Sequence, residues 1–238
     1  MRTSSPFPMY FRNPYILDSY TKLLLHMDGS DGSSTFTDEI GKTVTRHGDA
    51  QIDTAQSKFG GASGLFDGTG DYLSLATSAD FDFSSSYFTV DCWIRFSNVG
   101  HENQTIFSGT SNHRFNVRMS DVGNHRLILS LSNNGTSWNI ADVLCSKIDW
   151  VNGQWYHIAL QYDGDSYYLY VNGIVDKKIF SLLYLYGDTG IFIGVHGNLD
   201  SGTHFEGWID EFRVSKGIVR WSPAYNNFTP PTSPYPNE

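Results

Sequence analysis

The sequence predicts an all-β fold in which two antiparallel sheets stack as a β-sandwich. Aromatic residues make up 15% of the chain and charged residues only 17%, and a composition rich in Tyr, Phe, Val and Ile favours strands over helices. No segment keeps a 3.6-residue period, whereas short alternating segments recur between turn signals supplied by the 23 glycines. The 238 residues suffice for one core and neither half would complete a sandwich alone, so we expect one main domain.

Alternation and turn residues place the elements along the chain. One helical turn is expected at 78–83, where the alternation is interrupted. Strands are expected at 22–27, 43–45, 50–53, 63–66, 72–75, 88–96, 105–108, 114–119, 126–131, 154–162, 166–171, 174–180, 190–195 and 205–215.

Two local patterns are the clearest of these. Segment 88–96, FTVDCWIRF, places an apolar residue at every second position, which is typical of a half-buried strand. Segments 166–171 and 174–180 are joined by Asn172-Gly173, the dipeptide best suited to the two positive φ angles of a type I′ turn. We therefore expect a β-hairpin at this point.

The late segment 205–215, FEGWIDEFRVS, is apolar and aromatic except for its acidic pair, Asp210 and Glu211. Adjacent strand residues point to opposite faces, so we expect these two carboxylates to lie on opposite sides of the sheet. As the closing strand, this segment should pair near the opening strand 22–27, which Asp28 follows. The first and last strands would then meet at an acidic spot.

The two ends of the chain differ from the domain between them. Residues 1–21 carry three prolines among aromatics, a composition that suits an extended arm packed on its own domain or on a neighbouring subunit. Residues 222–238 carry five prolines and form a tail. The domain itself is expected to span residues 22–221.

Charge, hydropathy and cysteine content exclude several classes of protein. The net charge of −9, with only 16 Lys and Arg, argues against a nucleic-acid partner, which needs clustered cations. No apolar run approaches the roughly 18 to 20 residues of a membrane-spanning helix, and prolines stand where a signal peptide would have its apolar centre. Cys92 and Cys145 are either small buried thiols or a disulfide.

Five segments carry a family resemblance in this order: LLLHMDG, KFGGASGLFDGTGDYLSL, FTVDCWIRF, WYHIALQYDGDSYYLYVNGIV and FEGWIDEFRVSKGIVRW. They resemble the laminin G-like branch of the concanavalin A-like lectin and glucanase superfamily over residues 22–221. The resemblance implies a jelly roll of two antiparallel sheets. The residues of the first and last segments are most similar to those of domains in bacteriophage and marine bacterial surface proteins. This resemblance implies a location on a virion or an extracellular surface.

The resemblance also implies a structural calcium ion where the first and last strands meet. Carried onto this chain, Asp210 is the first ligand expected, Asp28 the second, and Asp67 or the carbonyl of Gly68 a third. Calcium prefers such carboxylate and carbonyl oxygens. The alternative is that these Asp-Gly pairs only make turns.

Catalysis is not expected, although the superfamily includes glycan-cleaving enzymes. Glycoside hydrolysis needs two carboxyl groups roughly 5 to 10 Å apart, and no predicted strand carries acids at alternate positions. Asp163 and Asp165 have the spacing but lie in a predicted turn.

Carbohydrate binding asks for an aromatic surface beside planar polar groups, because sugars present apolar C–H faces rimmed with hydroxyls. The alternative for any such residue is packing against the second sheet or another chain. The sheet candidates are Trp93, Arg95, Asn116 and Arg118, and the loop candidates are Trp138, His196 and His204, with Asn112, His113, Asn139 and Asn198 beside them.

We therefore expect a non-enzymatic carbohydrate-binding or adhesion module, part of a phage virion or surface structure. Its expected partners are glycans or host-surface polysaccharide, other subunits reached through the arm, and further copies of the chain. The alternative is a structural assembly protein without a glycan site, and a glycan-cleaving enzyme is a third possibility.

Overall fold

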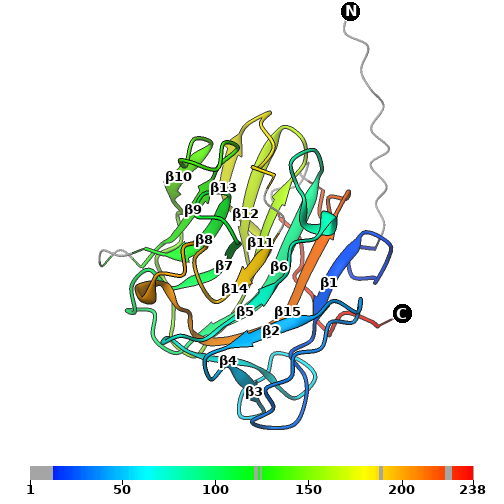
Figure 1. The fold of residues 1–238 in the computed structure, drawn as a ribbon, viewed down its shortest axis with the longest axis vertical. Helices are drawn as coiled ribbons and strands as arrows, with labels where there is room; N and C mark the ends of the chain where they lie inside the picture. The colour runs from blue at the N-terminus through cyan, green and yellow to red at the C-terminus, as the bar shows by residue number, and fades with distance from the viewer. Residues whose placement is uncertain (1–12, 121–122, 124, 188–189, 223–226, 238) are drawn as a thin grey trace, which may run out of the picture.

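A computed structural model describes residues 13–120, 123, 125–187, 190–222 and 227–237 of the chain. Two antiparallel sheets stack on one another (Figure 1) and enclose a single large core cluster. This confirms the predicted all-β jelly-roll sandwich. The core receives alternate side chains from both sheets, among them Cys92, Val117 and Leu129, all fully buried.

The first sheet, sheet A, has eight strands, and β1 pairs with β15 beside the main path. The pairing of opening and closing strands is confirmed, and Figure 1 shows them side by side. In spatial order sheet A contains β13 (Ile174–Phe180), β12 (Ser166–Val171), β11 (Trp155–Tyr162), β6 (Phe88–Phe96), β15 (Glu206–Lys216), β4 (Ser63–Asp67) and β3 (Gln51–Asp53), with β1 (Thr21–Leu25) on β15.

The second sheet, sheet B, has seven strands. The short helices η1 (Ala79–Phe81) and η2 (Ser201–Thr203) lie in connections. In spatial order sheet B contains β10 (Ala141–Leu144), β9 (Leu127–Leu131), β8 (Phe115–Met119), β7 (Thr105–Gly109), β14 (Ile191–Ile193), β5 (Tyr72–Leu75) and β2 (Val44–His47).

The predicted strands and the helical turn are confirmed, with small differences at their ends, and one strand was missed. That strand, β10, is a short edge strand with two exposed residues, so only half of it carries the burial that produces alternation. Asn172 and Gly173 have φ angles of 50° and 77°, as the predicted hairpin turn requires. Cys92 and Cys145 are free buried thiols.

Strand β15 contains a β-bulge at its acidic pair. Asp210 pairs with Trp93 and Arg213 pairs with Asp91, so two residues of β15 face one residue of β6. Glu211 takes the extra position with a φ of 50°. The prediction that Asp210 and Glu211 point to opposite faces is wrong, because the bulge resets the alternation and both carboxylates are buried on the side away from the core.

The two chain ends cover the outer side of sheet A. From the N-terminal side, the carbonyl of Pro14 accepts a 2.6 Å hydrogen bond from Arg213 Nη1. From the tail, Phe228 stacks on Trp221 with ring centroids 4.0 Å apart, and Tyr235 donates its hydroxyl hydrogen bond to Asp91. The described part of the predicted arm therefore packs on its own domain, while residues 1–12 lie outside the described residues.

Candidate functional site

The outer face of sheet B carries a row of mostly polar side chains. On β8, Phe115, Val117 and Met119 enter the core, so Asn116 and Arg118 lie on the opposite face. Strands about 4.8 Å apart make a seven-strand row about 29 Å long, whose central members Ser108, Asn116 and Ser130 are buried. The strand registers align Asp142, Ser130, Asn116, Ser108, Phe192, Ser74 and Thr45 across the sheet.

Five residues gather over β8, and we call His113, Asn116, Arg118, Trp138 and His196 the β8 cluster. The Trp138 ring centroid lies 4.9 Å from that of His113 and 6.0 Å from that of His196. Three separate segments supply these residues: strand β8 with His113 two positions before it, the β9–β10 loop, and the loop after β14. The cluster thus exists only in the folded chain.

Hydrogen bonds within the loops hold the cluster in place. In the β9–β10 loop, Asn139 Oδ1 accepts from the backbone N–H of Asn133 and from the Ser132 hydroxyl, each at 3.1 Å. The ring of His196 lies 2.7 Å from Asn198 Oδ1 through its Nδ1. These bonds order the two loops from which Trp138 and His196 project.

The amide of Asn116 lies on the same face of β8 as Arg118, because the two residues are two positions apart on one strand. The side chain is fully buried, and neither Nδ2 nor Oδ1 has a hydrogen-bond partner among the described residues. A buried amide without partners costs about 1 to 3 kcal/mol. It therefore favours any polar group that can reach it from this face.

The electrostatics of the cluster are set by burial and by nearby basic groups. Burial lowers the pKa of His196 below its usual value of 6.5, and Arg118 and His113 add to this although Asn198 opposes it. His196 is therefore neutral at pH 7. Arg118 is half-buried, and its Nη1 donates a 3.0 Å hydrogen bond to Asn103 Oδ1.

Of the predicted glycan residues, the structure brings Trp138 beside His196 and places Arg118 near His196, with Asn116 on the same face of β8 as Arg118. It places Trp93 and Arg95 elsewhere. Both lie on β6 of sheet A. Trp93 faces away from the core as predicted, yet it is only 6% exposed because other side chains cover it. These include Lys58, whose Nζ lies 3.9 Å from the Trp93 ring centroid. Arg95 stacks on the ring of Trp208.

His204 lies towards the other end of sheet B. Its ring centroid is 6.2 Å from that of Tyr72, which in turn stacks on His47 at 4.0 Å. Tyr72, His47 and Phe192 form an aromatic group on the same face that the sequence reasoning missed. Alternation in segment 72–75 was the signal that could have placed Tyr72 opposite the core.

The expected calcium ligands are only partly assembled. The backbone N–H groups of Lys58 and Phe59 donate to Asp210 Oδ2, while Asp210 Oδ1 is buried and has no hydrogen-bond partner in the part of the chain that the structure describes. A Cβ on Gly60 would lie 2.1 Å from the Asp28 carboxylate, so Asp28 and Asp210 face the same loop. Burial raises the pKa of Asp210 to about 7. An orphaned carboxylate oxygen beside a second carboxylate fits a hard cation.

Asp67 and Gly68 do not join this pair. Asp67 ends β4 opposite Glu206, and its Oδ1 accepts from the N–H of Thr69 as turn chemistry predicts. No group of three or more His, Cys, Asp or Glu side chains that could hold a metal is found among the described residues. A calcium ion would therefore rest on Asp28 and Asp210, completed by backbone carbonyls and water.

The remaining acids are engaged in the fold. Asp163 lies in the β11–β12 turn, where its Oδ1 accepts from the backbone N–H groups of Asp165 and Ser166. Glu211 Oε1 lies 2.8 Å from His26 Nδ1, and Glu211 Oε2 accepts from the N–H of Tyr235.

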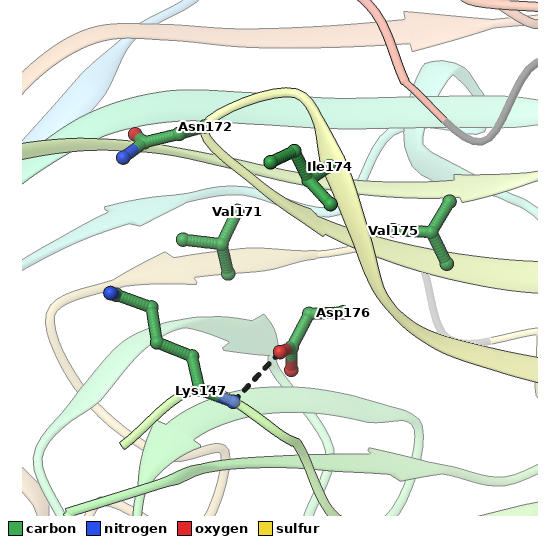
Figure 2. A pocket seen from close by; sticks show the side chains of 6 residues that line it. All are labelled: Lys147, Val171, Asn172, Ile174, Val175 and Asp176. Carbon is green, nitrogen blue, oxygen red and sulfur yellow. Dashed lines mark hydrogen bonds between the residues drawn. The ribbon is translucent and has the colours of Figure 1, made fainter. Parts of the chain in front are cut away.

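A hollow of 220 Å³ lies at the turn between β12 and β13 (Figure 2). Its walls are largely aliphatic, from Val171, Ile174 and Val175, and the backbone N–H of Lys147 donates to Asp176 Oδ1 at 2.8 Å. None of the predicted glycan or calcium residues lines it.

The fold and the polar, aromatic outer face of sheet B define a jelly-roll domain of the lectin type. A family model described as the concanavalin A-like lectin/glucanases superfamily matches residues 67–221, well over half of the chain. The chain belongs to this superfamily, as the resemblance implied. A search of curated proteins found no significant match.

Solved structures share the fold at low sequence identity. The binding domain of Paraclostridial Mosquitocidal Protein 1 is 15% identical with a TM-score of 0.65, covering 84% of this chain and 49% of that one. The receptor binding domain of botulinum neurotoxin D is 15% identical with a TM-score of 0.62, covering 84% and 50%. The chain thus spans about half the length of these two domains.

A third neighbour matches along nearly its whole length. It is domain 4 of AbnA, a GH43 extracellular arabinanase from Geobacillus stearothermophilus, solved in complex with arabinotriose. It is 19% identical with a TM-score of 0.57, covering 84% of this chain and 96% of that one. These neighbours are mostly binding domains. No described helix of the present chain is long and apolar enough to cross a membrane.

Proposed function

We propose that this domain is a non-enzymatic glycan-binding module whose binding site is the β8 cluster. The observation that carries the proposal is the convergence of Trp138 with two histidines from three chain segments, with Arg118 close enough to His196 to lower its pKa. A sugar ring would stack its C–H face on the Trp138 indole. Its hydroxyls would bond to the Asn116 amide and the Arg118 guanidinium.

Other observations support this proposal. The outer side of sheet A is covered by the chain's own ends, and on sheet B the cluster residues His113, Arg118 and Trp138 are partly exposed. A domain with the same fold and nearly the same length was solved with arabinotriose bound. Two further neighbours are toxin binding domains, which is consistent with recognition of a cell surface.

The test is a glycan array followed by isothermal titration with the best ligand. Trp138→Ala should lower affinity about tenfold or more, because stacking on an aromatic ring contributes about 1 to 3 kcal/mol in comparable base-stacking sites. Trp208→Ala, a half-buried Trp on sheet A, is the matched control and should bind as the wild type does. Equal losses in both variants, with both folded, would contradict the assignment.

The same proposal includes a location on a virion or an extracellular surface. Residues 1–21 would dock on neighbouring subunits, and the chain would form homo-oligomers.

The second candidate is an assembly protein without a glycan site. Exposed apolar residues near β13 favour it, since Phe180 is 74% and Leu182 66% exposed. An array without any hit, together with self-association in analytical ultracentrifugation that Phe180→Ser abolishes, would select the second candidate.

We also propose a structural calcium ion held by Asp28 and Asp210. The partnerless Oδ1 of Asp210 and the proximity of both carboxylates to the loop around Gly60 support this. Bound calcium should raise the melting temperature relative to protein in EDTA, because a ligand that binds only the native state stabilises it. Asp210→Asn should lose that increment and Asp67→Asn should keep it; an unchanged melting temperature in wild-type protein would refute the site.

A further inference from the structure

We infer that the β8 cluster selects glycans that bear a carboxylate, with Arg118 as the residue that binds the carboxylate. This inference rests on the proposed glycan-binding function and specifies its ligand class. It combines an arginine with no acidic partner among the described residues, a histidine whose pKa it lowers, and an aromatic ring beside that histidine.

The first observation is the charge of Arg118. Among the described residues, four Lys and Arg side chains form ion pairs with carboxylates. Arg213 and Arg220 do so, with Asp91 and Asp18 respectively. None of the ion pairs among the described residues involves Arg118.

The second observation is how Arg118 is held. Its Nη1 donates to the neutral amide oxygen of Asn103 at 3.0 Å, which orients the planar guanidinium without neutralising it. The side chain is half-buried, so its charge is less screened than at an open surface. An oriented guanidinium with donors to spare matches the two oxygens of a carboxylate.

The third observation is the set of titratable groups around it. His196 is close enough to Arg118 and His113 for both to lower its pKa, after the larger effect of burial. Asp200 is the carboxylate whose charge also reaches His196. Asp142, in the same row, already accepts a 2.7 Å hydrogen bond from Ser130. Protonation of His196, whose pKa lies below 6.5, would add positive charge beside a bound anion.

The rest of the cluster fits a sugar rather than a free anion. Trp138 lies between His113 and His196 and offers a flat apolar surface to a pyranose ring. The buried Asn116 amide can donate to one hydroxyl and accept from another. A uronic or sialic acid residue would satisfy both requirements, with its ring on Trp138 and its carboxylate on Arg118.

The experiment compares carboxylate-bearing oligosaccharides with their own methyl esters. A panel of oligouronates and sialylated oligosaccharides is printed beside the neutral esters and neutral glycans, and the hits are measured by titration calorimetry. The free acid should bind at least about tenfold more tightly than its ester, since hydrogen bonds to charged groups contribute about 1.5 to 3 kcal/mol. Affinity for the acid, and not for the ester, should rise as the pH falls below about 6.5, because burial and the neighbouring Arg118 lower the pKa of His196 below that value.

Variants separate charge from geometry. Arg118→Gln should abolish the preference for the acid, and Arg118→Lys should restore only part of it because a lysine lacks the planar fork. Arg46→Gln, an exposed arginine on β2, changes the net charge equally and should leave the preference intact. Thermal melting of each variant confirms that it is folded.

The outcomes distinguish this inference from the proposed function. Equal binding of acid and ester, with Trp138→Ala still inactive, would overturn the carboxylate selectivity and leave glycan binding in place. A preference that survives in Arg118→Gln would also overturn it. No binding to any glycan would overturn both.

Discussion

The buried ion pair beneath the C-terminal tail offers a strong test of how the chain ends are fixed. Arg213 Nε donates to Asp91 Oδ1 at 3.1 Å, and both side chains are almost fully buried. At this distance and an effective dielectric constant of about 20, the Coulomb attraction is about 5 kcal/mol. Burial alone would raise the pKa of Asp91, but Arg213, His157 and Tyr235 outweigh it and lower that pKa.

We expect Arg213→Met to destabilise the native state by about 3 to 5 kcal/mol, because it leaves a buried carboxylate without its counter-charge. Asp91→Leu should cost a similar amount through the stranded guanidinium. The double variant should be less destabilised than the sum of the two, with a coupling energy of about 2 to 3 kcal/mol.

The assay is urea unfolding of all four proteins at pH 7, followed by Trp fluorescence. Tyr235→Phe, which removes the hydroxyl that bonds to Asp91, should cost about 1.5 to 3 kcal/mol, whereas Tyr186→Phe at an exposed tyrosine should cost nothing measurable. Additive single-variant losses, within about 0.5 kcal/mol, would refute the view that Asp91 and Arg213 stabilise the tail as a pair.

Two further variants test the same side of sheet A. His157 is buried, and burial lowers its pKa below 6.5. Its contribution to the free energy of unfolding is therefore complete above pH 6.5 and is lost as the pH falls towards the folded-state pKa. His157→Gln should reduce the slope of the unfolding free energy against pH by up to about 1.4 kcal/mol per pH unit, and an unchanged slope would contradict this. At Gly173, with φ +77°, a Cβ would lie 1.9 Å from the carbonyl oxygen of Phe228, whereas Gly32, with φ +73°, has open space. Gly173→Ala should therefore expose the tail to limited proteolysis while Gly32→Ala, which shares the backbone cost, does not, and equal protection in both would show that Gly173 does not fix the tail.

The strands were predictable because alternation is a local consequence of burying one face. Segment 88–96 alternates throughout and became β6 with the predicted ends. The bulge in β15 was foreshadowed by the core residues Ile209 and Phe212, three positions apart, because an uninterrupted strand cannot place both on one face. Two core residues three positions apart in one strand therefore indicate that an extra residue, a β-bulge, lies between them.

The β8 cluster was predictable only as a set of residue types. Asn116 and Arg118 are two positions apart on one predicted strand, so the sequence alone places them on the same face. Nothing local relates them to Trp138 or His196, which are brought in by loops folded back over the sheet. The same limit explains Trp93, whose outward direction was correct but whose covering by a distant lysine depends on the loop around Lys58.

The sequence by itself determined that this chain folds as two stacked antiparallel sheets and that its hairpin turns at Asn172. These properties follow from side-chain period and turn chemistry, which act between neighbouring residues. The pairing of the first and last strands was expected from the sandwich fold and is confirmed by the structure. Only the tertiary structure decided that the chain ends cover the outer side of sheet A, and which polar side chains meet. Those depend on contacts such as Tyr235 with Asp91 and Trp138 with His113, between residues whose distance along the chain carries no information about their distance in space.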